Sequence, residues 1–195
     1  DTAARLLYER NDRAAAPILA KLATKSKSSL GRLHALYALK GLEALEETVL
    51  RQALSDADGV VREHAVRLSE GFLHHGAPSP ELWAKLRGLA SDPVIGVRYQ
   101  LAFTLGQVRH PERLAPLAQI ARRDAADPMM RAAVLSSLAE GAADMFVLLA
   151  SEGGAAGRSE MLRELAGVAG AANQPDGLAR VREALVSERD PLVAF

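Results

Sequence analysis

The sequence predicts an all-α fold made of stacked helix–turn–helix repeats, a right-handed α-α superhelix or solenoid. Aromatic residues make up only 4% of the chain, and the alternation of β-branched residues that is typical of strands is scarce. Five arginines recur at intervals of 30, 36, 33 and 27 residues, which is the period of stacked helical units. The same apolar pattern follows each of them. We therefore expect about five complete repeats with partial repeats at both ends, forming a single solenoid over residues 1–195.

The repeat arginines define the second helix of each repeat. They are Arg32, Arg62, Arg98, Arg131 and Arg158. The residues three, four and seven positions after each arginine are apolar, with Ser69 as the exception. Positions 3, 4 and 7 form one stripe on a helix, so each arginine is expected to open an amphipathic helix of roughly three turns. A glycine eight to ten positions after each arginine predicts the C-terminal cap; these are Gly41, Gly71, Gly106, Gly141 and Gly167.

The remaining elements follow in chain order. Acidic turns precede three of the second helices and predict helix starts, because Asp caps a helix N-terminus and Pro fits its first position. These turns contain Asp56 and Asp58, Asp92-Pro93, and Asp127-Pro128. The first helices are expected at 14–24, 42–54, 80–89, 111–121, 142–150 and 177–185. Residues 2–10 predict a second helix without its first. Asp190-Pro191 opens a turn whose arginine helix is missing, and apolar residues end the chain, so we expect the natural protein to continue.

Three of these segments resemble HEAT repeats, whose second helix opens with an Asp, then Val-Arg, then an Ala. The segments are Asp-Pro-Val-Ile-Gly-Val-Arg at 92–98, Val-Val-Arg-Glu-His-Ala at 60–65 and Asp-Pro-Met-Met-Arg at 127–131. The resemblance implies structural roles for the five repeat arginines and for the aspartates of the turns. We expect Asp92 with Arg98, and Asp127 with Arg131, to tie turn to helix and repeat to repeat.

A narrower resemblance rests on residues 1–10 and 32–42. These segments look like the HEAT region of large bacterial membrane-bound-dehydrogenase-like proteins, which carry a β-propeller before the repeats and a c-type haem domain after them. The resemblance implies an inert spacer within an exported, periplasmic oxidoreductase. Without it, a cytoplasmic location is the expectation. No catalytic or haem-binding residue of that family has a counterpart in this sequence.

Composition argues against several function classes. The 24 Lys and Arg balance the 24 Asp and Glu, so no overall positive field favours nucleic acid. Residues 1–40 carry a local excess of basic groups, and Lys21, Lys25 and Lys27 are expected to form a solvated rim. The absence of cysteine excludes disulfides, thiolate nucleophiles and iron–sulfur clusters from this segment. No apolar run approaches the roughly 18 residues that span a bilayer. We expect no direct membrane contact and identify no small-molecule substrate.

The residues that could carry chemistry have simpler interpretations. His34 and His64 lie two positions after their arginines, but the next repeats offer Gln100 and Ala133, so no metal site is expected. The HEAT-fold deoxyhypusine hydroxylases bind iron through repeated His-Glu dipeptides, and here only the reversed Glu63-His64 occurs. HEAT-like DNA glycosylases use basic and aromatic residues along the concave face. This chain has no continuous row of such residues, because its basic excess is confined to residues 1–40. The His74-His75 pair lies in a predicted loop.

Two further features complete the search for chemistry. Gly153-Gly154 with Gly157 lacks the following Lys-Ser or Lys-Thr of a phosphate loop and predicts an inter-helix turn. Trp83 accompanies an apolar stripe and is expected in the core. No catalytic constellation, metal or cofactor is therefore predicted, and the segment is expected not to be an enzyme.

The face opposite the apolar stripe carries the candidate binding residues. Positions 2 and 5 after each arginine point away from the core, toward the side that forms the concave groove in HEAT arrays. Tyr, Phe and Arg exposed along a groove are typical interface anchors. The candidates are His34, Tyr37, His64, Arg67, Gln100 and Phe103. We therefore expect a non-catalytic scaffold whose groove binds a protein partner or neighbouring domains of the same chain, with the aromatic side chains packing between helices as the alternative.

Overall fold

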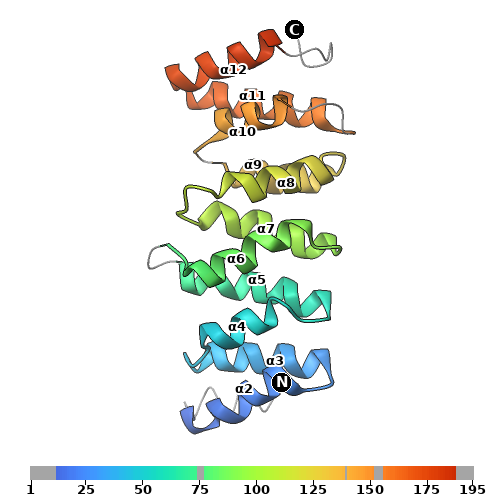
Figure 1. Ribbon diagram of the computed structural model, residues 1–195, viewed down its shortest axis with the longest axis vertical. Coiled ribbons are helices and arrows are strands. Elements are labelled where there is room, and N and C mark those ends of the chain that lie inside the picture. Colours follow the sequence, from blue (N-terminus) through green and yellow to red (C-terminus); the bar gives the residue numbers. More distant parts are fainter. Residues whose placement is uncertain (1–11, 74–76, 139, 152–155, 188–195) are drawn as a thin grey trace. The chain divides into compact units, whose positions relative to one another are not determined.

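The computed structural model describes residues 12–73, 77–138, 140–151 and 156–187, and within these ranges it contains helices and no strand (Figure 1). After a short 3-10 turn, η1 (Arg13–Ala15), the α-helices are α2 (Ala16–Lys25), α3 (Ser29–Gly41), α4 (Glu47–Ala53), α5 (Gly59–Leu73), α6 (Pro80–Gly88), α7 (Ile95–Gln107), α8 (Leu114–Asp124), α9 (Pro128–Ser136), α10 (Ala142–Ala150), α11 (Arg158–Ala172) and α12 (Pro175–Ser187). A second 3-10 turn, η2 (Leu89–Ser91), follows α6. The predictions made for residues 2–10, for His74-His75, for Gly153-Gly154 and for residues 190–195 lie outside the described residues.

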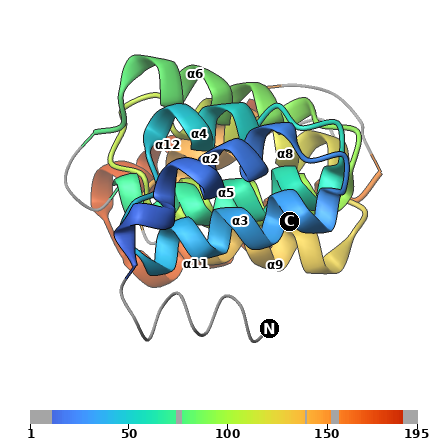
Figure 2. The ribbon, with the colours of Figure 1, turned by 90° about the horizontal axis from the view of Figure 1, so that it is seen from below.

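The helices form two compact units, Asp1–Leu101 and Ala102–Phe195, and the boundary falls within α7. In the first unit, α2, α4 and α6 pack in one layer and α3 and α5 in the other (Figure 2). In the second unit, α8, α10 and α12 form one layer and α9 and α11 the other. Each unit is thus a stack of helix pairs, with first helices on one side and second helices on the other. The predicted all-α solenoid of helix–turn–helix repeats is confirmed.

The core of each unit consists of the predicted apolar stripes. Positions 3, 4 and 7 after the repeat arginines are buried, apart from the half-buried Leu135. Leu50, Leu54, Leu82 and Leu86 of the first helices face these stripes in unit 1 and are at most 1% exposed. Trp83 is 5% exposed, which confirms its predicted place in the core. Burial of Leu, Val and Phe side chains at about 1.5–3 kcal/mol each is the main force that holds one pair against the next.

Helix starts follow the predicted signals, but two first helices begin three or more residues later than expected. Asp127 accepts hydrogen bonds from the amides of Met129 and Met130 and so caps α9, whose first residue is Pro128. The first helix predicted from residue 42 begins at Glu47, because Glu43 adopts a left-handed conformation (φ 52°) that ends α3 and starts a turn. The one predicted from residue 111 begins at Leu114, after a turn closed by the Arg113 amide and the His110 carbonyl.

The expected glycine caps are wrong. Gly41 is the last residue of α3, whose C-cap is Leu42, while Gly71, Gly106 and Gly167 lie within their helices and Gly141 (φ 95°) caps the N-terminus of α10 instead. Gly106 has a packing reason: a Cβ there would lie 2.8 Å from the Cβ and 2.9 Å from the Cα of Ser137. The glycine lets α7 approach the end of α9 closely, because any larger side chain would overlap the main chain of Ser137.

Candidate binding surface

Two arginines of unit 1 each bind an aspartate in the following repeat. Arg32 donates from Nε and Nη2 to the two carboxylate oxygens of Asp56, at 2.6 Å each. Arg62 donates in the same way to Asp92, at 2.7 and 2.8 Å. Both are two-point, charge-assisted pairs, the strongest class of side-chain hydrogen bond. We call this pair of contacts the Arg–Asp ladder.

The ladder is largely shielded from water, which alters the pKa of its carboxylates. The Arg62 and Asp92 side chains are only 12% and 4% exposed. Burial alone would raise the pKa of Asp92, but hydrogen bonds from Arg62 and from the Val94 amide lower it below its usual range. The Asp56 pKa is lowered for the same reasons, by Arg32 and the Asp58 amide against the effect of burial. Both carboxylates are therefore held in their charged form.

Each arginine also binds a main-chain carbonyl of its own turn. The Nη1 group donates to the carbonyl six residues earlier, at Ser26, Asp56, Asp92 and Ala125 for the arginines at 32, 62, 98 and 131. These carbonyls lie at the ends of the turns that precede the second helices. Since each arginine is the fourth residue of its helix, one geometry recurs in four repeats.

The expected pairings within a repeat are therefore different in the structure. Arg98 binds the main-chain carbonyl of Asp92, while the carboxylate of Asp92 is held by Arg62 of the preceding repeat. The carboxylate of Asp127 caps α9, and Arg131 pairs with Glu164 of the following second helix at 3.1 Å. The physical reason is the reach of the side chain. An arginine at the fourth position of a second helix lies close to the turn of the following repeat, and in the turn of its own repeat it reaches a main-chain carbonyl.

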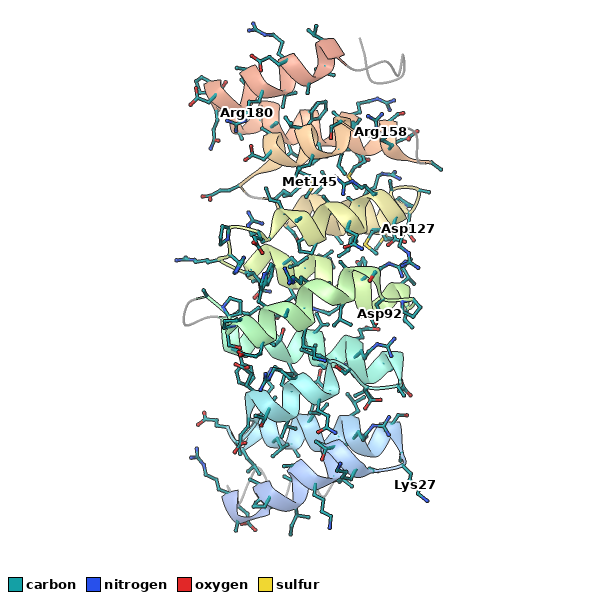
Figure 3. All side chains as sticks on the ribbon, in the orientation of Figure 1. Lys27, Asp92, Asp127, Met145, Arg158 and Arg180 are labelled. Carbon is teal, nitrogen blue, oxygen red and sulfur yellow. The ribbon has the colours of Figure 1, made fainter. Side chains whose placement is uncertain are left out.

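The fifth repeat keeps the arginine but changes its contacts. Arg158 is the first residue of α11 and is 8% exposed. It donates to the carbonyls of Leu149 and Ala150, at 3.2 and 2.9 Å, at the end of α10. Gly157 precedes it in a left-handed conformation (φ 77°), packed so closely against the main chain of Ala125 that a Cβ would overlap it. Figure 3 shows Asp127 and Arg158 at the same edge of unit 2.

The outward surface of α3 and α5 brings together two of the predicted binding residues. The Tyr37 hydroxyl lies 2.8 Å from Nδ1 of His64, and the two rings meet edge to face with centroids 5.5 Å apart. Tyr37 remains 36% exposed, and Arg67, one turn beyond His64 on α5, is exposed as well. We call the surface formed by His34, Tyr37, His64 and Arg67 the α3–α5 face.

Charges surround the tyrosine on this face. Burial raises the pKa of Tyr37, Glu63 and Glu70 raise it further, and Arg67 opposes the shift. The hydroxyl therefore stays protonated at neutral pH, where it shares a hydrogen bond with Nδ1 of His64. The face thus offers an aromatic ring, an imidazole and a guanidinium.

The other predicted residues are placed less favourably. His34 is exposed on α3, and Gln100 is half-buried and donates to Glu70 Oε1 at 3.2 Å. Phe103 is half-buried and belongs to the second unit. Sequence reasoning missed Glu63 and Glu70, which lie one and eight positions after Arg62. These positions flank the outward face, where side chains reach the adjacent helix, so a search of the flanks would have found them.

The chain matches one family model, described as HEAT repeats, over residues 46–139. Residues 46–139 are therefore similar to HEAT repeats. The matched HEAT segment runs from the start of α4 to beyond α9 and includes the arginines at 62, 98 and 131. The comparisons with curated proteins and with solved structures found no match. HEAT repeats generally form non-catalytic scaffolds that mediate protein–protein interaction, and the stacked helix pairs of this segment are consistent with such a repeat array.

The HEAT segment also borders a hollow that the sequence did not predict. A cavity of about 570 Å³ in unit 2 lies between the ends of α7 and α9 and the loop before α8. Arg113 lines it and donates to the carbonyls of Ser137 and Glu140, at 3.2 and 2.8 Å. Both terminal nitrogens of this arginine thereby tether the loop, so we assign it a structural role.

The described residues offer neither a metal site nor a membrane span. Among the described residues, no three His, Cys, Asp or Glu side chains cluster in a way that could hold a metal ion. Within the same ranges, every helix is too short or too polar to span a membrane.

Proposed function

We propose that this chain is a non-catalytic scaffold that binds a protein partner on the α3–α5 face. The observation that carries the proposal is the Tyr37–His64 pair, which is exposed and nevertheless fixed by a hydrogen bond and an edge-to-face contact. Tyrosine and arginine are the side chains that most often dominate the binding energy of interfaces. Arg67 beside the pair supplies the second of these.

Pre-organisation supports this interpretation. A tyrosine that is already held by a neighbour loses little side-chain entropy when a partner covers it. The Arg–Asp ladder joins the turns that lead into α3, α5 and α7, and so fixes the helices that present the face. Gln100, whose side chain is held by Glu70, would extend the face toward α7. Phe103 stays a separate prediction, because it lies in the other unit.

The experiment compares partner recovery by matched variants. The purified chain is immobilised and exposed to an extract of the cells that produce it, and the bound proteins are quantified by mass spectrometry. Tyr37→Ala with Arg67→Ala is expected to reduce recovery of the partner about tenfold or more, because both side chains are interface anchors. The control is Glu160→Ala with Arg163→Ala, which alters exposed residues at the second and fifth positions of another repeat.

Equal recovery by the wild type and the Tyr37 and Arg67 double variant would overturn the proposal. So would a partner that is lost equally with the control variant. Circular dichroism of each variant confirms that the helices remain folded, because both substitutions lie at exposed positions.

The second candidate function is a spacer within an exported multidomain protein. The resemblance of residues 1–10 and 32–42 to the HEAT region of dehydrogenase-like proteins favours it. Sequencing the gene on both sides of this segment tests the idea. A β-propeller upstream and a Cys-x-x-Cys-His motif downstream would support the spacer, and unrelated flanking sequence would contradict it.

A further inference from the structure

A row of aliphatic side chains is exposed at the start of the second helices of unit 1. Leu30, Val60, Val94 and Ile95 are 61%, 54%, 39% and 48% exposed. They lie in the first turn of α3 and α5 and at the beginning of α7. These positions form one edge of the unit, made by the turns between first and second helices, which we call the turn edge. Figure 3 shows Lys27 and Asp92 on this edge.

Local contacts place the members of the row side by side. The side chain of Ser29, next to Leu30, is hydrogen-bonded to Asp58, which in turn accepts from the Val60 amide at 2.8 Å. A Cβ on Gly59, next to Val60, would lie 2.7 Å from a methyl group of Val94. The Arg–Asp ladder joins the same turns, so the row is part of a rigid edge.

The turn edge is also basic. The arginine and the aspartate of each ladder pair neutralise one another. The edge also carries exposed lysines at the ends of the first helices and in the first turn, namely Lys25, Lys27 and Lys85, of which Lys85 donates to Ser55 Oγ at 2.7 Å. Basic residues in the last turn of a helix are stabilised by its dipole, which explains their position. The anions nearby are Asp58, engaged by Ser29 and the Val60 amide, and Glu63, which packs against Gly96.

We propose that the turn edge of unit 1 is a second docking surface, for an acidic amphipathic helix laid across the starts of α3, α5 and α7. Packed helices lie about 8–10 Å apart, so the row repeats at that distance. A helix presents one residue every seven positions at about 10.5 Å along one face, which matches this repeat. Acidic residues beside such an apolar seam would face the exposed cations.

The row distinguishes this partner from other anionic macromolecules. Aliphatic side chains cannot donate hydrogen bonds to phosphates, so an exposed row of them contributes little to binding a nucleic-acid backbone. Side chains that are only 39–61% exposed in the first turns of packed helices are also poorly placed to insert into a lipid bilayer. A helix that lies along the row buries all of them at once. This surface is separate from the α3–α5 face, and the two proposals can fail independently.

The test uses the full chain and a synthetic probe. The probe is a fluorescent helical peptide of about 21 residues with Leu at every seventh position and Glu beside the Leu seam. Its counterparts have Lys in place of Glu, or the same composition in scrambled order. By fluorescence anisotropy the acidic peptide is expected to bind at least about tenfold more tightly than either counterpart, and less tightly at high salt.

Variants locate the binding. Leu30→Ser with Val60→Ser is expected to weaken acidic-peptide binding about tenfold or more, because two exposed aliphatic contacts are removed. Lys27→Glu with Lys85→Glu should weaken it similarly. Ile18→Ser is the matched control, since Ile18 is exposed on α2 away from the turn edge. The Tyr37→Ala and Arg67→Ala double variant should bind the peptide like the wild type.

Three results would overturn the proposal. The first is an acidic peptide that binds no better than its counterparts. The second is binding that the Leu30 and Val60 substitutions leave unchanged. The third is a chain that does not bind the peptide but sediments with phosphatidylserine-containing vesicles, with the sedimentation lost on substitution of Leu30 and Val60. That result would indicate that the turn edge binds a membrane surface.

Discussion

The two units use the same arginine position in different ways. In unit 1, Arg32 and Arg62 each grip a shielded aspartate with two hydrogen bonds of 2.6–2.8 Å. In unit 2, Arg131 pairs through one nitrogen with Glu164, whose side chain is 41% exposed, and Arg158 donates to the main-chain carbonyls of Leu149 and Ala150. The carboxylate of Asp127 caps a helix. The arginine thus recurs in every repeat, but its contribution to stability depends on the group that accepts its hydrogen bonds.

The difference teaches that the acceptor's place in the chain matters more than the arginine. An aspartate in the turn of the next repeat is held in place by the backbone amides it accepts from, so little entropy is lost on pairing. A glutamate in the middle of an exposed helix must be immobilised by the pair itself. We therefore expect the ladder of unit 1 to stabilise the stack more than its counterparts in unit 2.

The largest expected effect comes from Asp92→Ala. This change leaves the shielded Arg62 without its carboxylate and removes the acceptor of the Val94 amide. We expect a loss of about 2–4 kcal/mol, near the range for breaking buried pairs, and a melting temperature lower by about 5–10 °C. Hydrogen exchange should accelerate most in α5 and at the start of α7. A loss below about 1 kcal/mol would contradict the claim that the Arg–Asp ladder stabilises unit 1 more than the corresponding arginine contacts stabilise unit 2.

Gly157→Ala tests whether close main-chain packing at Gly157 stabilises unit 2, where Arg131 pairs through one nitrogen in place of the two-point Arg–Asp pairs of unit 1. The substitution places a Cβ at φ 77° against the main chain of Ala125 and Ala126. We expect a loss of about 2–3 kcal/mol, measured by chemical denaturation. The matched control is Gly167→Ala, inside α11 with open space around it, which should stabilise by about 0.5–1 kcal/mol. Equal effects of the two would contradict the assigned role of Gly157.

Acid should weaken unit 1 through its ladder. The pKa of Asp56 and Asp92 is lowered in the folded chain by their arginines and by backbone amides, against the effect of burial. Their contribution is complete above the unfolded-state pKa of about 3.9 and is lost as the pH falls through the lower folded-state values. In urea unfolding between pH 6 and pH 2, Asp92→Asn should lose less stability on acidification than the wild type. Parallel curves would contradict this origin.

The smallest expected effect is that of Glu164→Ala. Its pair with Arg131 is 3.1 Å long and 41% exposed on the glutamate side, so we expect a change below about 1 kcal/mol. Arg131 keeps its bond to the Ala125 carbonyl at 2.9 Å in the variant. Chemical denaturation of the wild type and the variant in low and high salt measures the electrostatic contribution of the Arg131–Glu164 pair. A loss as large as that of Asp92→Ala would make the two units equivalent.

The sequence predicted the fold well because helical periodicity is a local signal. The residues three, four and seven positions after Arg62 or Arg98 fall on one face whatever the rest of the chain does, and they are buried. The prediction of glycine caps failed because a glycine can either adopt the left-handed conformation that ends a helix or permit two helices to approach closely. At Gly106 it permits close approach of Ser137 rather than a left-handed cap, and this distinction requires the neighbouring helix.

The candidate site was predictable only in part. The outward direction of Tyr37 and His64 follows from their positions after the arginines, but the hydrogen bond between them depends on how α3 and α5 stack. The partner of Asp92 was equally hidden, since sequence proximity favours Arg98 whereas the reach of the side chain selects Arg62. Contacts between repeats require the stacking geometry, which no single-helix pattern contains.

The Arg–Asp ladder gives the stack a direction. Each of its repeats presents an acidic turn to the repeat before it and an arginine to the repeat after it, so the two ends of a repeat are chemically unlike. A gene duplication that copies a turn together with its second helix inherits one half of a contact on each side. Copies of this kind pair head to tail, whereas an inverted copy would set like charges against each other and a truncated one would leave a charge without its partner.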